Sequence, residues 1–160
     1  TLKQKQVETY VDPKGSDFGK YKNCFMIKPN IKELRTATLE NPEMDIDDKV
    51  WLSMQKARAD VCLLTKSSDG MSLYSANKKQ DFDIISSEVY DVTGAGDTVI
   101  AALVFARNRQ LSLTDAASFS NYCAAFAVTK IGCAKMDIPE LANIMSQNET
   151  FVDILPNGKG

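Results

Sequence analysis

Short apolar runs bounded by turn residues predict strands in the first half of the chain, and longer runs with helical periodicity separate them. In 46–59, for example, Val50, Met54 and Ala57 fall on one side of a helix. Strands alternating with helices over short connections predict an α/β fold with a largely parallel sheet. The expected strands are 7–11, 24–27, 61–65, 71–74 and one or two within 82–90; the expected helices are 30–40, 46–59, 98–109, 113–130 and 139–145.

The pattern contains no internal repeat and no low-complexity linker. Residues 1–146 are therefore expected to form one domain or one piece of a larger domain, and 147–160 a loosely held tail. The longest apolar run, 99–106, is eight residues, whereas a membrane span requires about 20. The polar first residues do not form a signal peptide, so we expect a cytoplasmic protein without a membrane segment.

Charge and residue usage exclude several classes of function. Nineteen basic and 21 acidic residues give a net charge of -2, and no run of like charge suggests nucleic acid or anionic lipid as a partner. The absence of histidine excludes Ser-His-Asp and Cys-His nucleophile pairs and histidine-ligated metals. The widely spaced cysteines have apolar neighbours and are expected as buried thiols in a reducing compartment; they are Cys24, Cys62, Cys123 and Cys133.

The strongest local signal is the sequence DVTGAGD at 91–97, which follows an expected strand and opens an apolar helix. Glycines at this junction let the amides of Ala95, Gly96 and Asp97 point outward together at a helix N-terminus. Such an anion hole would stabilise a phosphoryl group in transfer, and Asp97 could accept a proton from an attacking hydroxyl. Alternatively Asp97 only caps the helix, and the spacing alone does not decide between the two interpretations.

Two other phosphate loops are excluded by inspection. A dinucleotide-binding turn would need Gly or Ala in place of Val99. A P-loop would need GxxxxGK followed by Ser or Thr, whereas 15–21 is one residue short and has Tyr21 after Lys20.

A second candidate group lies early in the chain. Asn30 with Glu33 three residues later is typical of a helix capping box. Glu33 could also face Mg²⁺ through water, since Mg²⁺ prefers carboxylate oxygen, and both roles can coexist at one helix start. Lys14 could reach a nucleotide phosphate as a point charge, or could be a solvated turn lysine.

These motifs together resemble the ribokinase-like (PfkB) sugar kinases. DVTGAGD before an apolar helix resembles the C-terminal signature of that family. Residues 30–33 resemble the NxxE motif of the family, 65–70 its nucleotide-phosphate turn, and 120–125 its alanine-rich helix. Within the family, 11–18 and 129–134 are most similar to the heptose 7-phosphate kinases. The resemblance covers about 7–145.

The resemblance implies a ribokinase-like three-layer α/β/α fold, of which this chain is the C-terminal half. It also implies ATP- and Mg²⁺-dependent phosphorylation of the anomeric hydroxyl of D-glycero-D-manno-heptose 7-phosphate, toward ADP-heptose and the lipopolysaccharide core. Asp97 would be the catalytic base, Gly94, Ala95 and Gly96 the anion hole, and Glu33 the contact to Mg²⁺ through water. The implied nucleotide-binding residues are Lys14, Asn30, Ile31, Lys32, Glu33, Thr65, Lys66, Gly70 and Asn121.

In this family the N-terminal half carries the sugar site and a β-sheet lid that commonly builds a homodimer. The resemblance therefore implies that the isolated chain lacks heptose kinase activity, binds ATP weakly at most, and self-associates or needs its complement. Two alternatives stay open: the same portion of another sugar or nucleoside kinase of the family, and a non-catalytic nucleotide-binding or assembly module.

Overall fold

The computed structural model describes residues 7–85, 94–128 and 139. The chain divides into two compact units, Thr1–Asp83 and Ile84–Gly160.

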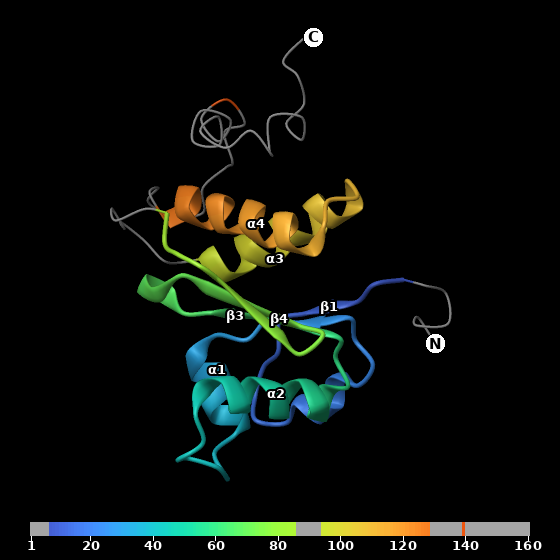
Figure 1. Cartoon of the computed structure of the whole chain (residues 1–160), viewed down its shortest axis with the longest axis vertical. Helices are drawn as coiled ribbons and strands as arrows, with labels where there is room; N and C mark the ends of the chain where they lie inside the picture. Colours follow the sequence, from blue (N-terminus) through green and yellow to red (C-terminus); the bar gives the residue numbers. More distant parts are fainter. Residues whose placement is uncertain (1–6, 86–93, 129–138, 140–160) are drawn as a thin grey trace. The chain divides into compact units, whose positions relative to one another are not determined.

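The first unit is built on a mixed five-stranded sheet in the order β1-β2-β3-β4-β5 (Figure 1). Strands β1, β2 and β3 pair in parallel, and β3, β4 and β5 pair antiparallel. The predicted α/β class is confirmed, although parallel pairing in the sheet, which we expected to be largely parallel, is confined to the first three described strands. The strands are β1 (Tyr10–Val11), β2 (Met26–Ile27), β3 (Val61–Thr65), β4 (Met71–Ser75) and β5 (Lys78–Phe82).

Strand β5 was not predicted. We expected one or two strands within 82–90, but 83–85 lie outside the described strands, and 86–90 lie outside the described residues. The turn before β5 has φ 47° at Ala76 and 60° at Asn77, the left-handed pair of a two-residue hairpin loop. Because β5 is a polar edge strand with Lys78 to Asp81 exposed, it carries no apolar alternation by which it could be recognised.

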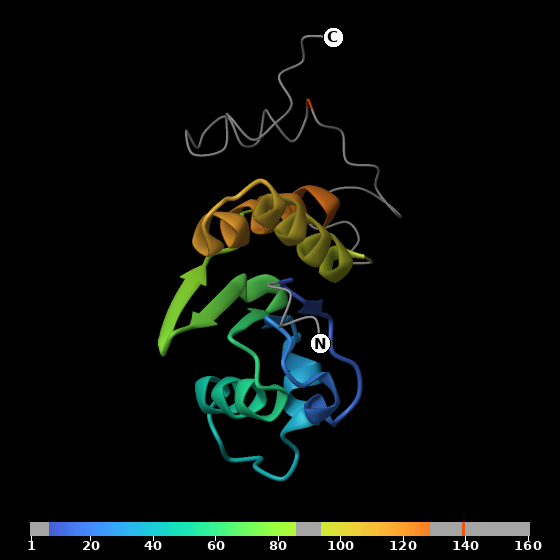
Figure 2. The same ribbon diagram turned by 90° about the vertical axis from the view of Figure 1, so that its right-hand side faces the viewer.

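Helices α1 (Ile31–Ala37) and α2 (Ile46–Ala57) lie on one side of this sheet (Figures 1 and 2). Both are shorter than predicted. The Thr38 hydroxyl donates to the Leu34 carbonyl where α1 ends, and Arg58 adopts a left-handed conformation with φ 46° where α2 ends.

The core of the unit lies between the helices and the sheet. Leu34, Val50 and Met54 from the helices meet sheet residues including Leu64 and Tyr74. The predicted burial of cysteine is confirmed for the three described thiols, Cys24, Cys62 and Cys123, which are free and buried, whereas Cys133 lies outside the described residues. Burial raises the pKa of Cys62 and raises the pKa of Cys123 to about 12, so neither thiol is ionised near neutral pH.

The second unit contains α3 (Ala95–Asn108) and α4 (Leu113–Val128), which pack side by side (Figure 2). Helix α3 begins three residues before the predicted 98, because Gly94 with φ 79° serves as its N-cap. The predicted helix 113–130 is confirmed as far as Val128; its end, and all of 139–145 except Pro139, lie outside the described residues. In the part of the chain that the structure describes, no helix combines the length and apolarity needed to cross a bilayer.

Candidate active site

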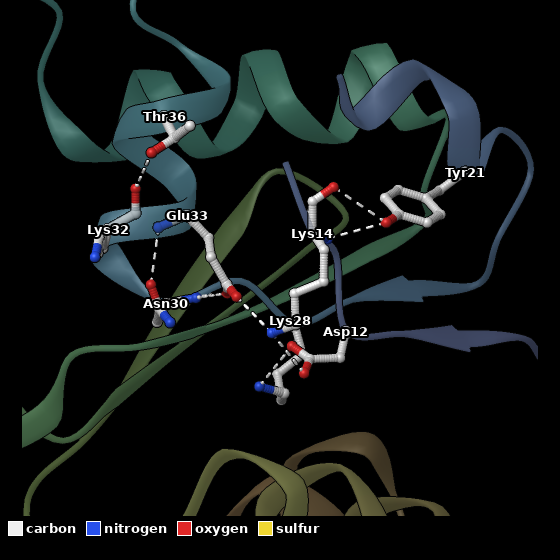
Figure 3. A network of polar contacts seen from close by, with 8 residues as sticks. All are labelled: Asp12, Lys14, Tyr21, Lys28, Asn30, Lys32, Glu33 and Thr36. Carbon is white, nitrogen blue, oxygen red and sulfur yellow. Dashed lines mark hydrogen bonds and ion pairs between the residues drawn. The ribbon is translucent and has the colours of Figure 1, made fainter. Parts of the chain in front are cut away.

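A cluster of charged side chains lies in the first unit (Figure 3). Lys14 Nζ lies 2.6 Å from Glu33 Oε1 and 3.1 Å from Asp12 Oδ2, and Lys28 Nζ lies 3.0 Å from Asp12 Oδ1. The hydrogen bond to Glu33 and then that to Asp12 raise the pKa of Lys14 above its ordinary value. Lys14 is therefore positively charged near neutral pH, and its ammonium lies between two carboxylates.

Strand topology brings this cluster together. Asp12 follows β1, Lys28 follows β2, and Thr65 ends the neighbouring parallel strand β3. The carboxyl ends of parallel strands lie at one edge of a sheet, which is where α/β proteins commonly bind ligands. The Thr65 N–H donates to the Pro29 carbonyl over 3.1 Å, so β3 and the loop before α1 are joined at this edge.

Asn30 and Glu33 form the predicted capping box. The Glu33 N–H donates to Asn30 Oδ1 over 2.8 Å, and the Asn30 N–H donates to Glu33 Oε2 over 2.9 Å. Glu33 thus uses one oxygen to cap α1 and the other to bind Lys14. Each carboxylate oxygen has two lone pairs, so both retain capacity to accept a hydrogen bond from water.

The Glu33 carboxylate fits a Mg²⁺ ion that is held mainly by water and phosphate. In the described ranges, no three acidic, cysteine or histidine side chains are grouped so as to enclose a metal. Mg²⁺ commonly keeps several waters and takes one or two carboxylates together with substrate phosphates. Glu33, at the edge of the sheet, offers such a carboxylate.

The turn after β3 contains two more predicted site residues, Lys66 and Gly70. The Lys66 N–H donates to the Gly70 carbonyl over 2.8 Å, and Gly70 has φ 73°, a value that favours glycine. The Lys66 ammonium lies 3.1 Å from Asp81 Oδ1 on β5, so this charge is tied to the hairpin. Ser67 of the turn and α1 line one hollow; its lining residues are Asn30, Ile31, Lys32, Arg35, Thr36, Leu39 and Ser67.

The remaining predicted residues lie in the second unit, and all of them except Asn121 lie at the start of α3. Ala95, Gly96 and Asp97 form the first turn, where backbone N–H groups have no acceptor within the helix. A Cβ atom on Gly94 would meet nothing within 4 Å, so the positive φ and not lack of space favours glycine there. The Asp97 side chain is exposed, and a carboxylate and three amides therefore share one helix end. Asn121 lies on α4 and is 8% exposed.

Three residues of this network were not predicted from the sequence: Asp12 and Lys28, which form ion pairs, and Tyr21, whose hydroxyl accepts from the Lys14 N–H (Figure 3). Asp12 and Lys14 are two residues apart, a spacing that places both side chains on one face of an extended segment. That spacing could have identified Asp12 as a partner of Lys14. No sequence pattern identifies Lys28, because a lysine at the end of a short apolar strand does not reveal which carboxylate it binds.

The sequence model of the pfkB family of carbohydrate kinases matches residues 1–141. The chain belongs to this family. It is 40% identical over 147 residues to the bifunctional protein HldE of Sulfurimonas denitrificans, covering 88% of this chain and 30% of that protein. The HldE proteins of Aliarcobacter butzleri and Helicobacter pylori are 38% and 37% identical, over 92% and 91% of this chain and 33% and 31% of their own lengths. The chain thus spans about a third of the length of these relatives.

Solved structures show the fold to be ribokinase-like. Ribokinase from Thermotoga maritima superposes with a TM-score of 0.81 at 18% identity, over 91% of this chain and 51% of that protein. Arabidopsis thaliana ribokinase complexed with ribose and ATP gives 0.76 at 24% identity, over 90% and 49%. A ribokinase-type protein from Escherichia coli, solved with ATP and Mg²⁺, gives 0.66 at 22% identity, over 78% and 40%.

Proposed function

We propose that this chain supplies the ATP-binding residues and the catalytic base of a kinase that phosphorylates the anomeric hydroxyl of D-glycero-D-manno-heptose 7-phosphate. The observation that carries the proposal is the start of α3, where Gly94 caps a helix whose first turn contains the backbone amides of Ala95, Gly96 and Asp97 together with the exposed Asp97 carboxylate. Membership of the pfkB family supports a sugar as acceptor. The relatives named HldE and the resemblance of 11–18 and 129–134 support heptose, and with it a cytoplasmic step toward ADP-heptose and lipopolysaccharide.

In the proposed reaction the acceptor oxygen attacks the γ-phosphorus of ATP, its proton passes to Asp97, and ADP leaves. The amides of Ala95, Gly96 and Asp97 donate to the oxygens of the transferring phosphoryl group. The partial positive charge of the helix N-terminus favours the negative charge that develops there.

The charged cluster of the first unit serves the nucleotide in this proposal. An ammonium has three N–H donors, and Lys14 uses two of them on Glu33 and Asp12, which leaves one for a phosphate oxygen. Bound Mg²⁺ would neutralise phosphate charge, and Glu33 would hold its water. Asn30, Ile31 and Lys32 line the adjoining hollow, and we assign Thr65, Lys66, Gly70 and Asn121 to the surroundings of the nucleotide.

We also propose that the sugar phosphate is held by the N-terminal half of a complete kinase, which in the family carries the sugar site and the dimer-forming lid. Phosphoryl transfer requires the hydroxyl to be held in line with the γ-phosphate, and such positioning contributes about 7–11 kcal/mol in favourable systems. The 160-residue polypeptide is therefore expected to show no measurable heptose kinase activity by itself.

A hybrid enzyme tests the role of the chain. The chain replaces the segment of the Sulfurimonas denitrificans HldE protein that it matches, and ADP release with heptose 7-phosphate is measured. Turnover by the hybrid, with none by the isolated chain, is the expected result. A folded hybrid that binds ATP but transfers no phosphate would instead support the non-catalytic module.

The acceptor needs a different experiment, because the hybrid borrows its sugar site from the relative. The protein encoded by the complete reading frame that contains this chain is assayed with heptose 7-phosphate, ribose and fructose 6-phosphate. We expect the highest kcat/KM for heptose 7-phosphate. A preference for either other sugar would assign the chain to another kinase of the family.

A further inference from the structure

The Tyr21 hydroxyl contacts the backbone of Lys14 twice. The Lys14 N–H donates to this hydroxyl over 2.9 Å, and the hydroxyl donates to the Lys14 carbonyl oxygen over 3.3 Å (Figure 3). The loop turns immediately afterwards at Gly15, with φ 82°. One side chain therefore holds both polar backbone groups of a residue in an irregular segment.

Tyr21 is itself well anchored. It ends the short 3₁₀ helix η2 (Phe18–Tyr21), whose start is capped by Asp17 accepting from the Gly19 N–H over 2.8 Å. Its ring packs against the core and meets the fully buried Phe18 edge to face, with 6.5 Å between ring centroids. The hydroxyl thus extends from the core to the Lys14 loop.

The other end of Lys14 is held by acidic groups. Its ammonium lies between Asp12 and Glu33, although the side chain is 66% exposed. The almost fully buried Lys28 binds Asp12 in turn. Because a lysine side chain has several rotatable bonds, exposed ion pairs alone fix its ammonium weakly, and a fixed backbone restricts where that ammonium can lie.

We infer that Tyr21 is a positioning residue for Lys14, fixing the loop so that the ammonium meets Glu33 at the edge of the sheet. The value of this placement for catalysis rests on the proposed nucleotide role of Lys14. No chemical step is assigned to Tyr21, since its hydroxyl is engaged by the Lys14 backbone.

The test is Tyr21→Phe in the 160-residue chain, which keeps the ring in the core and removes only the hydroxyl. NMR should show about tenfold faster hydrogen exchange of the Lys14 amide, the effect of losing one hydrogen bond. Side-chain NMR should also show weaker contacts between the Lys14 and Glu33 side chains, because the loop no longer places the ammonium at the carboxylate. Tyr10→Phe is the matched control, because the Tyr10 hydroxyl contacts Glu8 instead, and it should change neither quantity.

Unchanged exchange of the Lys14 amide and unchanged contacts between the Lys14 and Glu33 side chains in Tyr21→Phe would overturn the inference. If that variant does not fold, hydrogen exchange is measured in the unsubstituted chain. A Lys14 amide that exchanges there as fast as in an unstructured peptide also overturns the inference. Binding of MgATP, measured by calorimetry in the hybrid enzyme, separates the two proposals. Weaker binding in Tyr21→Phe than in Tyr10→Phe supports both, whereas a freed Lys14 with unchanged MgATP affinity supports positioning and removes Lys14 from the nucleotide site.

Discussion

The two groups of candidate residues are built in opposite ways. In the first unit, Asp12, Lys14 and Glu33 meet through side chains from separate segments, and Lys14 and Glu33 are 19 residues apart. In the second unit, the start of α3 is made by consecutive residues, and three of its four proposed donors and acceptors are backbone amides. The first group therefore depends on tertiary packing, and the second on one turn.

This difference determines which substitutions matter. A backbone amide survives replacement of its side chain, so the proposed anion hole is sensitive to conformation and insensitive to most residue changes. The charged cluster has the opposite sensitivity, since each ion pair is lost with one side chain. Asp97 is the exception in the second group, because its proposed role needs the carboxylate itself.

The largest effect is expected for Asp97→Asn in the hybrid enzyme. Asparagine keeps the size of the side chain but cannot accept the proton of the acceptor hydroxyl, so kcat should fall by about three orders of magnitude or more, with MgATP affinity retained. Asp115→Asn, in the first turn of α4, is the matched control and should stay within a few-fold of the unsubstituted rate. Indifference of kcat to Asp97→Asn would favour the non-catalytic module.

Gly94→Ala and Gly15→Ala form a matched pair, because both glycines have φ near 80° and neither Cβ would meet a close neighbour. Each should lower the free energy of unfolding by roughly 1–2 kcal/mol, since alanine is strained at this φ. Hydrogen exchange should localise the Gly94→Ala effect to α3 and the Gly15→Ala effect to the Lys14 loop. An effect spread evenly over both units would contradict the contrast between them.

A smaller effect is expected when Glu33 is changed. Glu33→Ala removes the acceptor of the Asn30 N–H and should cost about 1 kcal/mol of unfolding free energy, as other lost helix caps do. Glu33→Gln should cost less than half as much, because its amide oxygen can still cap α1. The ion pair with the exposed Lys14 adds little to stability. Urea unfolding followed by Trp51 fluorescence measures the unfolding free energy of both variants. Equal losses in the two variants would show that the charge of Glu33 contributes more to stability than its hydrogen bond to the Asn30 N–H.

The same contrast explains what the sequence could predict. The Asn30–Glu33 capping box and the Gly94 turn were predicted because each depends on residues at most three apart. The ion pair between Lys66 and Asp81 was not predicted, because the two residues are 15 positions apart. One belongs to a turn and the other to an edge strand that was itself not predicted. Tyr21 was missed for a related reason: its hydroxyl binds backbone groups, which leave no mark on the sequence.

The smallest effect is expected from mild acid, and it should be confined to the first unit. Lys79 and then the Tyr74 hydroxyl bind Asp47 on α2 and hold its pKa below the ordinary 3.8, and Ser72 and then Lys66 lower the pKa of Asp81. A carboxyl whose pKa is lower in the folded state stabilises fully above its unfolded pKa, and this contribution is lost as pH falls through the folded value. Stability should therefore decline below about pH 4.

Trp51, the only tryptophan, reports on this region because its ring lies edge to face with Tyr74, 5.4 Å between centroids. Its fluorescence should change on acidification before the helical signal of α3 and α4, whose contact is largely apolar and includes the stacked rings of Phe105 and Phe119. Asp47→Asn should weaken the pH dependence of the Trp51 signal, since a side chain that does not titrate cannot lose charge. A fluorescence transition that coincides with loss of helix in both units, unaltered by Asp47→Asn, would show that acid acts on the chain as a whole and not on the ion pairs of the first unit.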